Sequence, residues 1–394
     1  MNLSTICLAI FLGVFCVSAA AVESAAEEKR STSPAASSAS SKFMSSEDGW
    51  LDVSGFLDEA YGFVPIAFPI TEPAVGYGAG GGLLFVDRDK TKVDSRPGYG
   101  RPNLTAVGGL GTENGTWGVF AGDSRYWFDD RLQTLTGIVY ASVNLDFYGI
   151  GQDSRLRDHP LRYNLEPLAG LVHAKYRLGD SRVHAGLGYA FATTAVTFDA
   201  PAATPGIPDI QNVSRVGGVT LSLTYDSRDN IFTPRSGTYL DVSGGLFSQA
   251  LGGDSNFQRA GLTAIQFFPL GQDLTLGLNA GAMASFGDVP FYLRPFIVLR
   301  GVPAMRYQGD EVSQLEAELR WQCWKRFSIV GFGGSGTAWN DFARVDKRIT
   351  VSSGGVGFRY EIARSYGLHM GLDVAYGPDG PAIYVQIGSA WIRP

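Results

Sequence analysis

Ionisable residues gather in one short part of the chain, between residues 297 and 324. The stretch IVLRGVPAMRYQGD places Arg300 beside Gly301, and EVSQLEAELRW follows it. In the second stretch, charged side chains share one face of a period-two alternation: Glu316, Glu318 and Arg320. Apolar side chains share the other face: Leu315, Ala317, Leu319 and Trp321. From spacing alone, the simplest interpretation is a polar lining next to a solvated loop.

Two other places combine acidic and basic residues. Arg359 and Glu361 alternate with apolar residues in the same way as Glu316 and Glu318 do. A separate motif at a strand end shares a turn-forming pattern: Asp226, Arg228, Asp229, Pro234 and Gly237. Its carboxylates could hold a metal, but a network of carboxylates and an arginine that stabilises the turn is favoured. No metal and no cofactor is expected.

The sequence gives little support to an enzyme. The four histidines are His159, His173, His184 and His369, and none lies beside a G-x-S-x-G nucleophile motif. GFGGSG (331–336) has the spacing of a dinucleotide fingerprint, but TAWNDF follows it without a helical period. We therefore expect no catalytic residue.

Composition excludes several classes of protein. The chain has 394 residues, 18% charged and 12% aromatic residues, 51 glycines and a formal charge of −6. An average soluble domain has about 25% charged residues. The acidic balance, without a basic patch, argues against nucleic acid as a partner.

The N-terminus predicts export. Residues 1–21 have an apolar centre and end in small residues, as a signal peptide does. Residues 22–62 are expected to be a flexible linker followed by a short amphipathic segment. No later stretch reaches the roughly 18 apolar residues of a membrane helix, so a membrane-embedded chain would have to be a β-barrel.

From about Val75 onward the pattern has period two. Segments of about ten residues show one apolar face and one polar face, and end in aromatic residues or turns, which is typical of transmembrane barrels. A soluble β-sandwich also alternates, but would carry more surface lysine and glutamate. Residues 63–394 are therefore predicted to form an all-β, antiparallel transmembrane barrel.

Fifteen strands are clear from the pattern, and bacterial single-chain barrels have an even number. The missing strand is expected at 63–72 or at 291–300, which gives a predicted total of 16.

Four stretches together resemble the bacterial surface antigen group, the BamA/TamA superfamily of outer-membrane barrels. They are ITEPAVGYGAGGGLLF (70–85), FYGIG (147–151), YDSRDNIFTPRSG (225–237) and LRGVPAMRYQGD (299–310). Two departures matter. Residues 22–60 are too short for the polypeptide-transport-associated (POTRA) domains that family members usually carry, so the chain resembles a branch lacking them. Gly334 stands where the family's aspartate would face the loop arginine.

The resemblance implies that the loop carrying Arg300 folds back into a polar lumen. Because Gly334 cannot pair with Arg300, we expect Glu316 or Glu318 to replace the aspartate. The resemblance also implies a weak lateral seam, which we place between the glycine-rich strand and the last strand. The candidate residues are Gly76, Gly78, Gly80 and Trp391. Alternatively, these glycines line the lumen and make room for the loop.

Two functions fit these features. The resemblance implies an outer-membrane barrel that assists the insertion or translocation of proteins or lipids. The alternative is a passive channel with a polar lumen narrowed by a loop. Expected partners are outer-membrane lipid and, for the first function, a periplasmic or outer-membrane protein or further copies of the chain.

Overall fold

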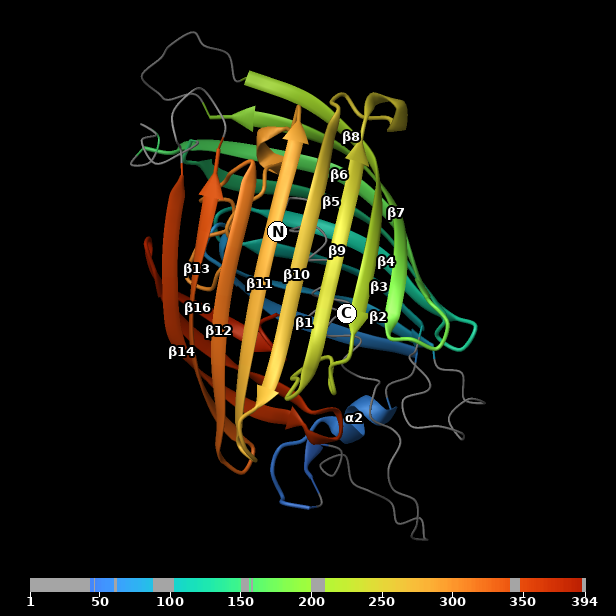
Figure 1. The fold of residues 1–394 in the computed structure, drawn as a ribbon, viewed down its shortest axis with the longest axis vertical. Helices are drawn as coiled ribbons and strands as arrows, with labels where there is room; N and C mark the ends of the chain where they lie inside the picture. Colours follow the sequence, from blue (N-terminus) through green and yellow to red (C-terminus); the bar gives the residue numbers. More distant parts are fainter. Residues whose placement is uncertain are drawn as a thin grey trace.

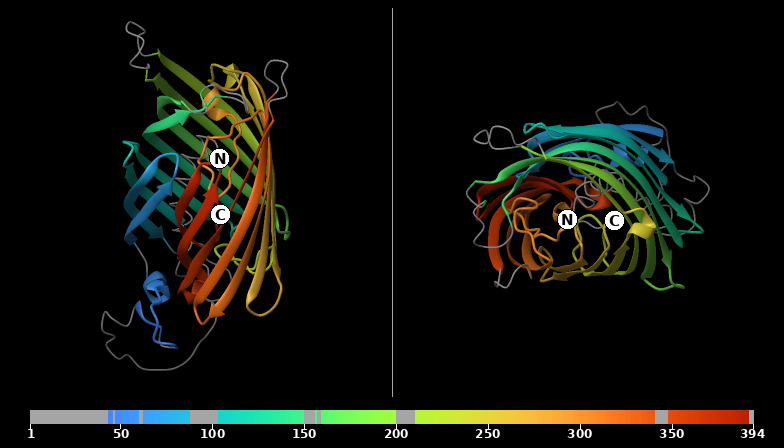
Figure 2. Two further views of the ribbon diagram at one scale, coloured as in Figure 1. Left: turned by 90° about the vertical axis from the view of Figure 1, so that its left-hand side faces the viewer. Right: turned by 90° about the horizontal axis from the view of Figure 1, so that it is seen from above.

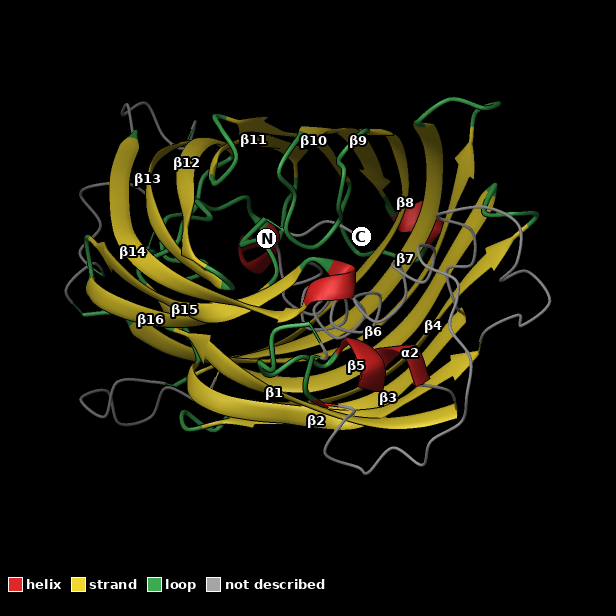
Figure 3. Cartoon of the chain, turned by 90° about the horizontal axis from the view of Figure 1, so that it is seen from below, coloured by secondary structure: helices red, strands yellow, loops and turns green. Residues whose placement is uncertain are grey.

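The computed structural model describes these residues: 43–45, 47–59, 62–87, 103–149, 156, 159–199, 210–340 and 348–391. The predicted signal peptide lies outside them. Sixteen antiparallel strands follow one another in chain order in a single sheet, which curls into a barrel (Figures 1 and 3). In the described part of the chain, no helix has the length and apolarity to cross a membrane.

The strands have these bounds: β1 (Gly62–Glu72), β2 (Gly76–Asp87), β3 (Asn103–Thr112), β4 (Trp117–Trp127), β5 (Leu132–Phe147), β6 (Leu161–Arg177), β7 (Val183–Phe198), β8 (Ile210–Asp226), β9 (Gly237–Phe247), β10 (Phe257–Pro269), β11 (Leu274–Gly287), β12 (Glu311–Trp324), β13 (Phe327–Trp339), β14 (Ile349–Ala363), β15 (Leu368–Gly377) and β16 (Gly380–Ile387). The helices are α2 (Ser54–Glu59) and the short 3-10 turns η2 (Gln249–Leu251), η3 (Phe291–Leu293) and η4 (Arg364–Tyr366).

The predicted all-β barrel of 16 strands is confirmed. Of the two candidates for the missing strand, residues 63–72 lie in β1, whereas residues 291–300 contain η3 and continue as a loop. The short amphipathic segment is only partly helical, because α2 begins at Ser54 and leaves Trp50 outside it.

The period-two alternation places apolar side chains on the outer surface of the barrel, where they contact lipid. Large exposed side chains mark this face: Leu187, Leu221, Leu315, Ile329 and Val356. Each of the strands β2 to β15 has a paired strand on both sides, so the backbone groups of these strands can be satisfied within the sheet, which is the condition for spanning a bilayer. Below, the barrel end near α2 is called the α2 end, and the other is called the loop end.

The lumen is polar on one side only. Inward residues of β2 to β7 are apolar and buried: Leu84, Val86, Leu104, Val139, Val143, Leu145, Leu165 and Val196. Tyr292, Leu293, Phe296 and Met305 pack against them from the loop between β11 and β12 (288–310). The expectation of a polar lumen was therefore wrong for this wall, because the folded-in loop turns it into a hydrophobic core.

Candidate functional site

The loop 288–310 returns into the barrel (Figure 2). Its Arg300 reaches inward side chains of β12 and β15. Gly301 has φ +89°, a left-handed conformation that favours glycine. Its backbone N–H donates to the Tyr384 Oη of β16 at 2.9 Å. A Cβ at Gly301 would lie 3.2 Å from the Ala375 Cβ of β15. The Arg-Gly pair is thus a tight turn pressed against β15 and β16.

Arg300 lies among three carboxylates. Its Nε donates to Glu316 Oε1 at 2.8 Å, and its Nη1 lies 2.8 Å from Glu318 Oε2 and 2.9 Å from Asp373 Oδ2. The guanidinium carbon sits 3.6 Å from the ring centre of Phe332, a cation–π contact. The structure therefore places both predicted glutamates beside Arg300. All of these charged groups are buried.

Asp373 was not predicted as a partner. This carboxylate of β15 also accepts hydrogen bonds from Arg359, at 2.5 Å from Nη1 and 2.9 Å from Nη2. Asp373 therefore joins the loop arginine to an arginine of β14. The signal in the sequence was a single carboxylate on the polar face of the strand 367–377.

The position of the family aspartate has no room for a side chain. A Cβ at Gly334 of β13 would lie 2.7 Å from the Leu315 carbonyl oxygen and 2.9 Å from Leu299 Cδ2. Leu299 belongs to the same loop as Arg300. The loop lies so close to β13 that the third carboxylate comes from β15 instead.

Trp391 is part of this cluster, which corrects the prediction that it closes the seam. The chain bends at Gly388, where φ is +74°, and β16 ends at Ile387. The bend turns Trp391 inward, so that its Nε1 donates to Glu316 Oε2 at 2.6 Å. The indole is 4% exposed and packs against Phe267.

The strand-end motif forms the predicted carboxylate and arginine network. Arg228 Nη2 lies 2.7 Å from Asp226 Oδ2, and Asp229 Oδ1 accepts the backbone N–H groups of Arg235 and Ser236. Gly237 has φ +104°, as the turn requires. The described residues contain no group of three side chains able to hold a metal ion.

The loop between β8 and β9, which carries this motif, also contacts inward residues at the α2 end of the barrel. The Pro234 carbonyl accepts a hydrogen bond from Arg320 Nη2 at 2.7 Å, which links the loop to β12. Phe232 is buried against Tyr366 and Leu368 of the β14–β15 turn. Glu361 lies apart from the Arg300 cluster, and its carboxylate is 4.0 Å from Arg364.

The seam lies between β1 and β16. Among the described strands, these two end the sheet order, and no ladder joins them. Gly78 and Gly80 of β2 pair with β1 on one side and with β3 on the other, and Gly76 pairs with Glu72 of β1. The predicted seam at these glycines was therefore wrong. Gly80 instead leaves space for a ring, because its Cβ would lie 2.3 Å from Phe68 Cζ.

Prolines occupy the β1 edge that faces β16. The Tyr77 carbonyl of β2 accepts a hydrogen bond from the backbone of Glu113 on the β3 side. The backbone N–H and C=O groups of alternate residues in a strand point to opposite neighbouring strands. Those of Tyr77 point to β3, so those of the residue opposite it on β1, Thr71, point away from β2. The same holds for every second residue of β1 before Thr71. They include Pro65 and Pro69, which lack the N–H that a ladder needs.

The edge of β16 has the same defect. Val385 N lies 3.3 Å from Thr71 Oγ1 of β1, so Val385 faces the seam. Pro381 lies four residues before Val385, so it is on the same edge of β16, and it also lacks a backbone N–H. Beyond Val385, β16 continues for only two residues, to Ile387, whereas β1 starts nine residues before Thr71, at Gly62. The half of the β1 edge nearest the α2 end has no paired strand in the described structure.

The folded-in loop contacts both sides of this seam at the loop end. Ala304 N donates to Glu72 Oε1, on the last residue of β1, at 3.0 Å. Arg306 Nη2 lies 2.8 Å from Asp379 Oδ1, in the turn between β15 and β16. Because the two strands share no ladder, these contacts are ties across the seam.

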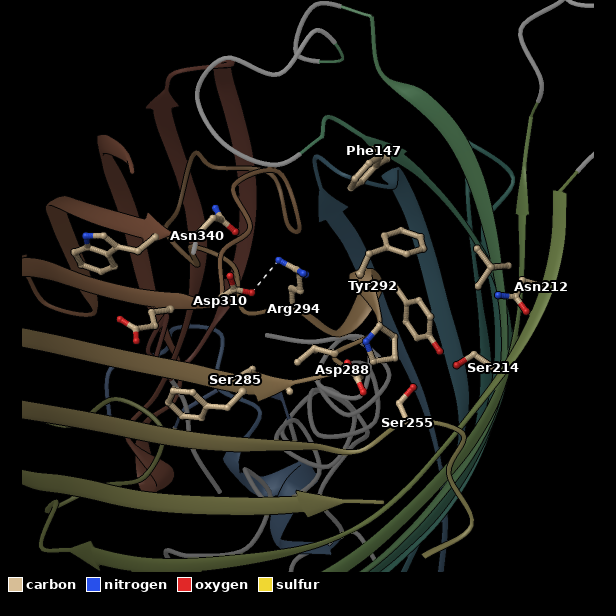
Figure 4. A pocket seen from close by; sticks show the side chains of 18 of the residues that line it. Phe147, Asn212, Ser214, Ser255, Ser285, Asp288, Tyr292, Arg294, Asp310 and Asn340 are labelled. Carbon is tan, nitrogen blue, oxygen red and sulfur yellow. Dashed lines mark hydrogen bonds and ion pairs between the residues drawn. The ribbon is translucent and has the colours of Figure 1, made fainter. Parts of the chain in front are cut away.

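A chamber of about 1510 Å³ opens above the loop at the loop end. Figure 4 shows that Tyr292 and Arg294, with Asp310 bonded to Arg294, face Asn212 and Ser214 of β8 across this space. The chamber is part of the lumen and is lined by both aromatic and polar side chains, among them Phe147, Tyr292, Asn212 and Asn340.

Comparison with known proteins gives a family domain and a fold. Residues 174–297 match the Omp85 superfamily domain, which bears out the predicted resemblance. No curated protein matches the chain in sequence.

Three solved structures have a similar fold. BamA from Haemophilus ducreyi lacking POTRA domains 1–3 has 13% identity and a TM-score of 0.55, and the match covers 82% of this chain and 68% of that one. CdiB from Escherichia coli has 11% identity and a TM-score of 0.57, with coverage of 82% and 61%. CdiB from Acinetobacter baumannii has 9% identity, a TM-score of 0.53, and coverage of 82% and 59%. The chain thus spans less than two thirds of either CdiB chain.

Proposed function

We propose that this outer-membrane barrel, which carries an Omp85 superfamily domain, assists the insertion or translocation of proteins or lipids through the seam between β1 and β16. The observation that carries the proposal is the unpaired seam. Its two edges lack donors at Pro65, Pro69 and Pro381, and β16 bends away at Gly388.

Backbone groups on the free half of the β1 edge have no strand to pair with in the described structure. An unpaired backbone group in the hydrocarbon region costs several kcal/mol. The free half of β1 therefore gains stability when another extended chain pairs with it, as in β-strand addition. Pro65 and Pro69 limit that pairing to alternate positions, which favours a reversible contact over a permanent one.

The Arg300 cluster supports this function by fixing the loop. Arg300 is held by Glu316 and Glu318 on β12 and by Asp373 on β15. The loop then presents Ala304 and Arg306 to the two sides of the seam. In this proposal the cluster positions the ties and does not contact the client.

A locked seam tests the proposal. Cysteines replace Thr71 and Val385, and Cys323 is changed to serine so that no other thiol remains in the described chain. Folding of an unfolded client barrel is followed in vesicles that contain the oxidised or the reduced variant. We expect faster client folding than in empty vesicles with the reduced variant, and loss of that acceleration after oxidation.

A matched cysteine pair controls for the disulfide itself. Ala264 and Ala280 are opposite each other on the paired strands β10 and β11, so oxidation there should leave the acceleration intact. Equal client folding in all vesicles, including empty ones, would contradict the proposal. A steady open conductance from the same vesicles would then favour the passive channel.

A further inference from the structure

Residues 43–45 and 47–52 fold as a tight hairpin, and together with residues 53–56, which lead into α2, they are called the rim segment below. Met44 and Leu51 form an antiparallel bridge. The backbone N–H of Ser45 donates to the Trp50 carbonyl at 2.9 Å, and that of Asp52 donates to the Phe43 carbonyl at 2.9 Å. The hairpin precedes α2, and both lie at the α2 end of the barrel (Figure 1). The Arg300 cluster and the seam do not involve these residues.

Arg326, in the turn between β12 and β13, fixes the rim segment to the barrel. Its Nε lies 2.7 Å from Asp48 Oδ2, and its Nη1 lies 2.9 Å from Asp52 Oδ2. The Arg326 side chain is 2% exposed. Val53 N also donates to the Ile362 carbonyl at 2.8 Å. A buried arginine between two carboxylates makes this a specific docking contact.

The rim segment is docked against the lipid-facing surface. Trp50 meets the rings of Trp324 and Phe327 edge to face, each at 5.4 Å. Tyr360 Oη donates to the Leu51 carbonyl at 2.7 Å. Phe327 and Tyr360 have the same parity as the lipid-facing residues of β13 and β14. Trp50 therefore extends the row of aromatic side chains that barrels place at the membrane interface.

Four large apolar side chains of the rim segment remain exposed: Phe43 at 42%, Met44 at 48%, Leu51 at 46% and Phe56 at 38%. The rings of Phe43 and Phe56 stack at 5.6 Å. Nearby, the Lys325 Nζ lies 5.4 Å from the Trp50 ring and 5.3 Å from the Trp324 ring. Aromatic and aliphatic side chains with an adjacent lysine suit the boundary between headgroups and acyl chains.

We infer that the rim segment is a membrane-interfacial anchor, whose occupant is the lipid headgroup layer next to the barrel. Continuity with the lipid-facing aromatic row carries the inference. Interfacial elements insert their apolar side about 5–10 Å into the headgroup boundary, which is the level that aromatic rows occupy. The anchor would hold lipid beside β12 to β14, whose residues the rim segment contacts.

Site-specific fluorescence tests the anchor in the full chain. A polarity-sensitive dye is attached to Leu51→Cys, in a Cys323→Ser background, in vesicles of phosphatidylethanolamine and phosphatidylglycerol. We expect a blue-shifted emission, strong quenching by a headgroup-attached quencher, and iodide quenching reduced at least about fivefold relative to an aqueous position.

Two control positions give the dye response in water and in the hydrocarbon core. Gly271 lies in the β10–β11 turn at the same barrel end with nothing within 4 Å of its added Cβ, so Gly271→Cys reports water. Ile329 faces lipid on β13, so Ile329→Cys reports the hydrocarbon. If the dye at position 51 is as accessible to iodide as the dye at position 271, the inference is overturned. Met44→Cys provides a second labelling site should the Leu51 variant fold poorly.

Discussion

The Arg300 guanidinium of the folded-in loop lies 2.9 Å from the Asp373 carboxylate of β15. Asp373 is fully buried and belongs to the strand beside the seam strand. The contact joins a loop that enters from the loop end to β15, the strand that pairs with the edge strand β16. The same loop thus contacts the buried ion pairs through Arg300 and both sides of the seam through Ala304 and Arg306.

Replacing Arg300 should destabilise the barrel strongly. Arg300→Ala leaves the buried carboxylates of Glu316 and Glu318 without this cation, and leaves Asp373 with Arg359 alone. Breaking a buried ion pair costs about 3–5 kcal/mol in the free energy of unfolding. Urea unfolding in detergent micelles measures the loss. Arg300→Lys keeps the charge but not the planar fork, and should fall between wild type and alanine. Equal free energies of unfolding for all three proteins would contradict a stabilising role of the ion pairs around Arg300.

The third carboxylate that pairs with Arg300 should be required at Asp373 of β15 and should not be replaceable by one at position 334 of β13. Asp373→Asn removes the charge shared by Arg300 and Arg359, and should cost several kcal/mol in the free energy of unfolding. Adding Gly334→Asp should not restore stability, because its Cβ would meet the Leu315 carbonyl at 2.7 Å. Recovery of wild-type stability in the double variant would show that the family position can serve here.

The inward tryptophan should contribute a measurable hydrogen bond. Trp391→Phe keeps an aromatic ring but removes the donor to Glu316 Oε2. Leaving that buried oxygen without its donor should cost about 1–3 kcal/mol, measured by thermal unfolding. Trp321→Phe on the lipid-facing surface is the matched control, and should change the free energy of unfolding by less than about 0.5 kcal/mol. Equal effects of the two substitutions would argue against the inward position.

Restoring donors to the seam should make it less mobile. Pro65→Val with Pro69→Val supplies two N–H groups to the β1 edge, one at position 69 near the end of β16 and one at position 65 in the half that an incoming strand would pair with. We expect slower hydrogen exchange at β1 and slower client folding in vesicles. Pro167 of β6 lies inside the paired sheet, at a gap in its ladder with β5, so Pro167→Val should leave client folding unchanged. An effect of Pro167→Val as large as that of the double variant would remove the seam from the explanation.

Docking of the rim segment should resist acid. The hydrogen bond from Arg326 lowers the pKa of Asp48 to about 2. Burial opposes ionisation of Asp52, but hydrogen bonds from Ser54 and Arg326 outweigh it and lower its pKa. Carboxylates with lowered pKa values stabilise the docked state above their unfolded pKa of about 3.9, and lose that effect as the pH falls through the folded value.

The rotational mobility of the dye at position 51 measures this docking. It should stay constant from neutral pH down to about pH 4 and rise between about pH 4 and pH 2. Asp48→Asn with Asp52→Asn should show high mobility already at neutral pH. Release near pH 6 would point to a different titrating group.

The sequence alone was sufficient for the barrel, because each strand repeats the same period-two rule. Lipid outside and protein inside sort side chains locally, so the number of strands and the inward face of Glu316 and Glu318 could be predicted. The Arg-Gly turn could be located from its motif. None of these features depends on how distant segments meet.

The tertiary structure alone decided the contents of the lumen and the place of the seam. Alternation tells which side a residue faces but not what lies opposite, so it missed Asp373 as a partner and the apolar wall. One positive φ at Gly388 turned Trp391 from the sheet into the cluster. The seam was predicted at the glycines of β2 but lies between β1 and β16. Its position could not be predicted, because strand pairing there depends on the backbone donors of two edges that lie more than 300 residues apart in the sequence.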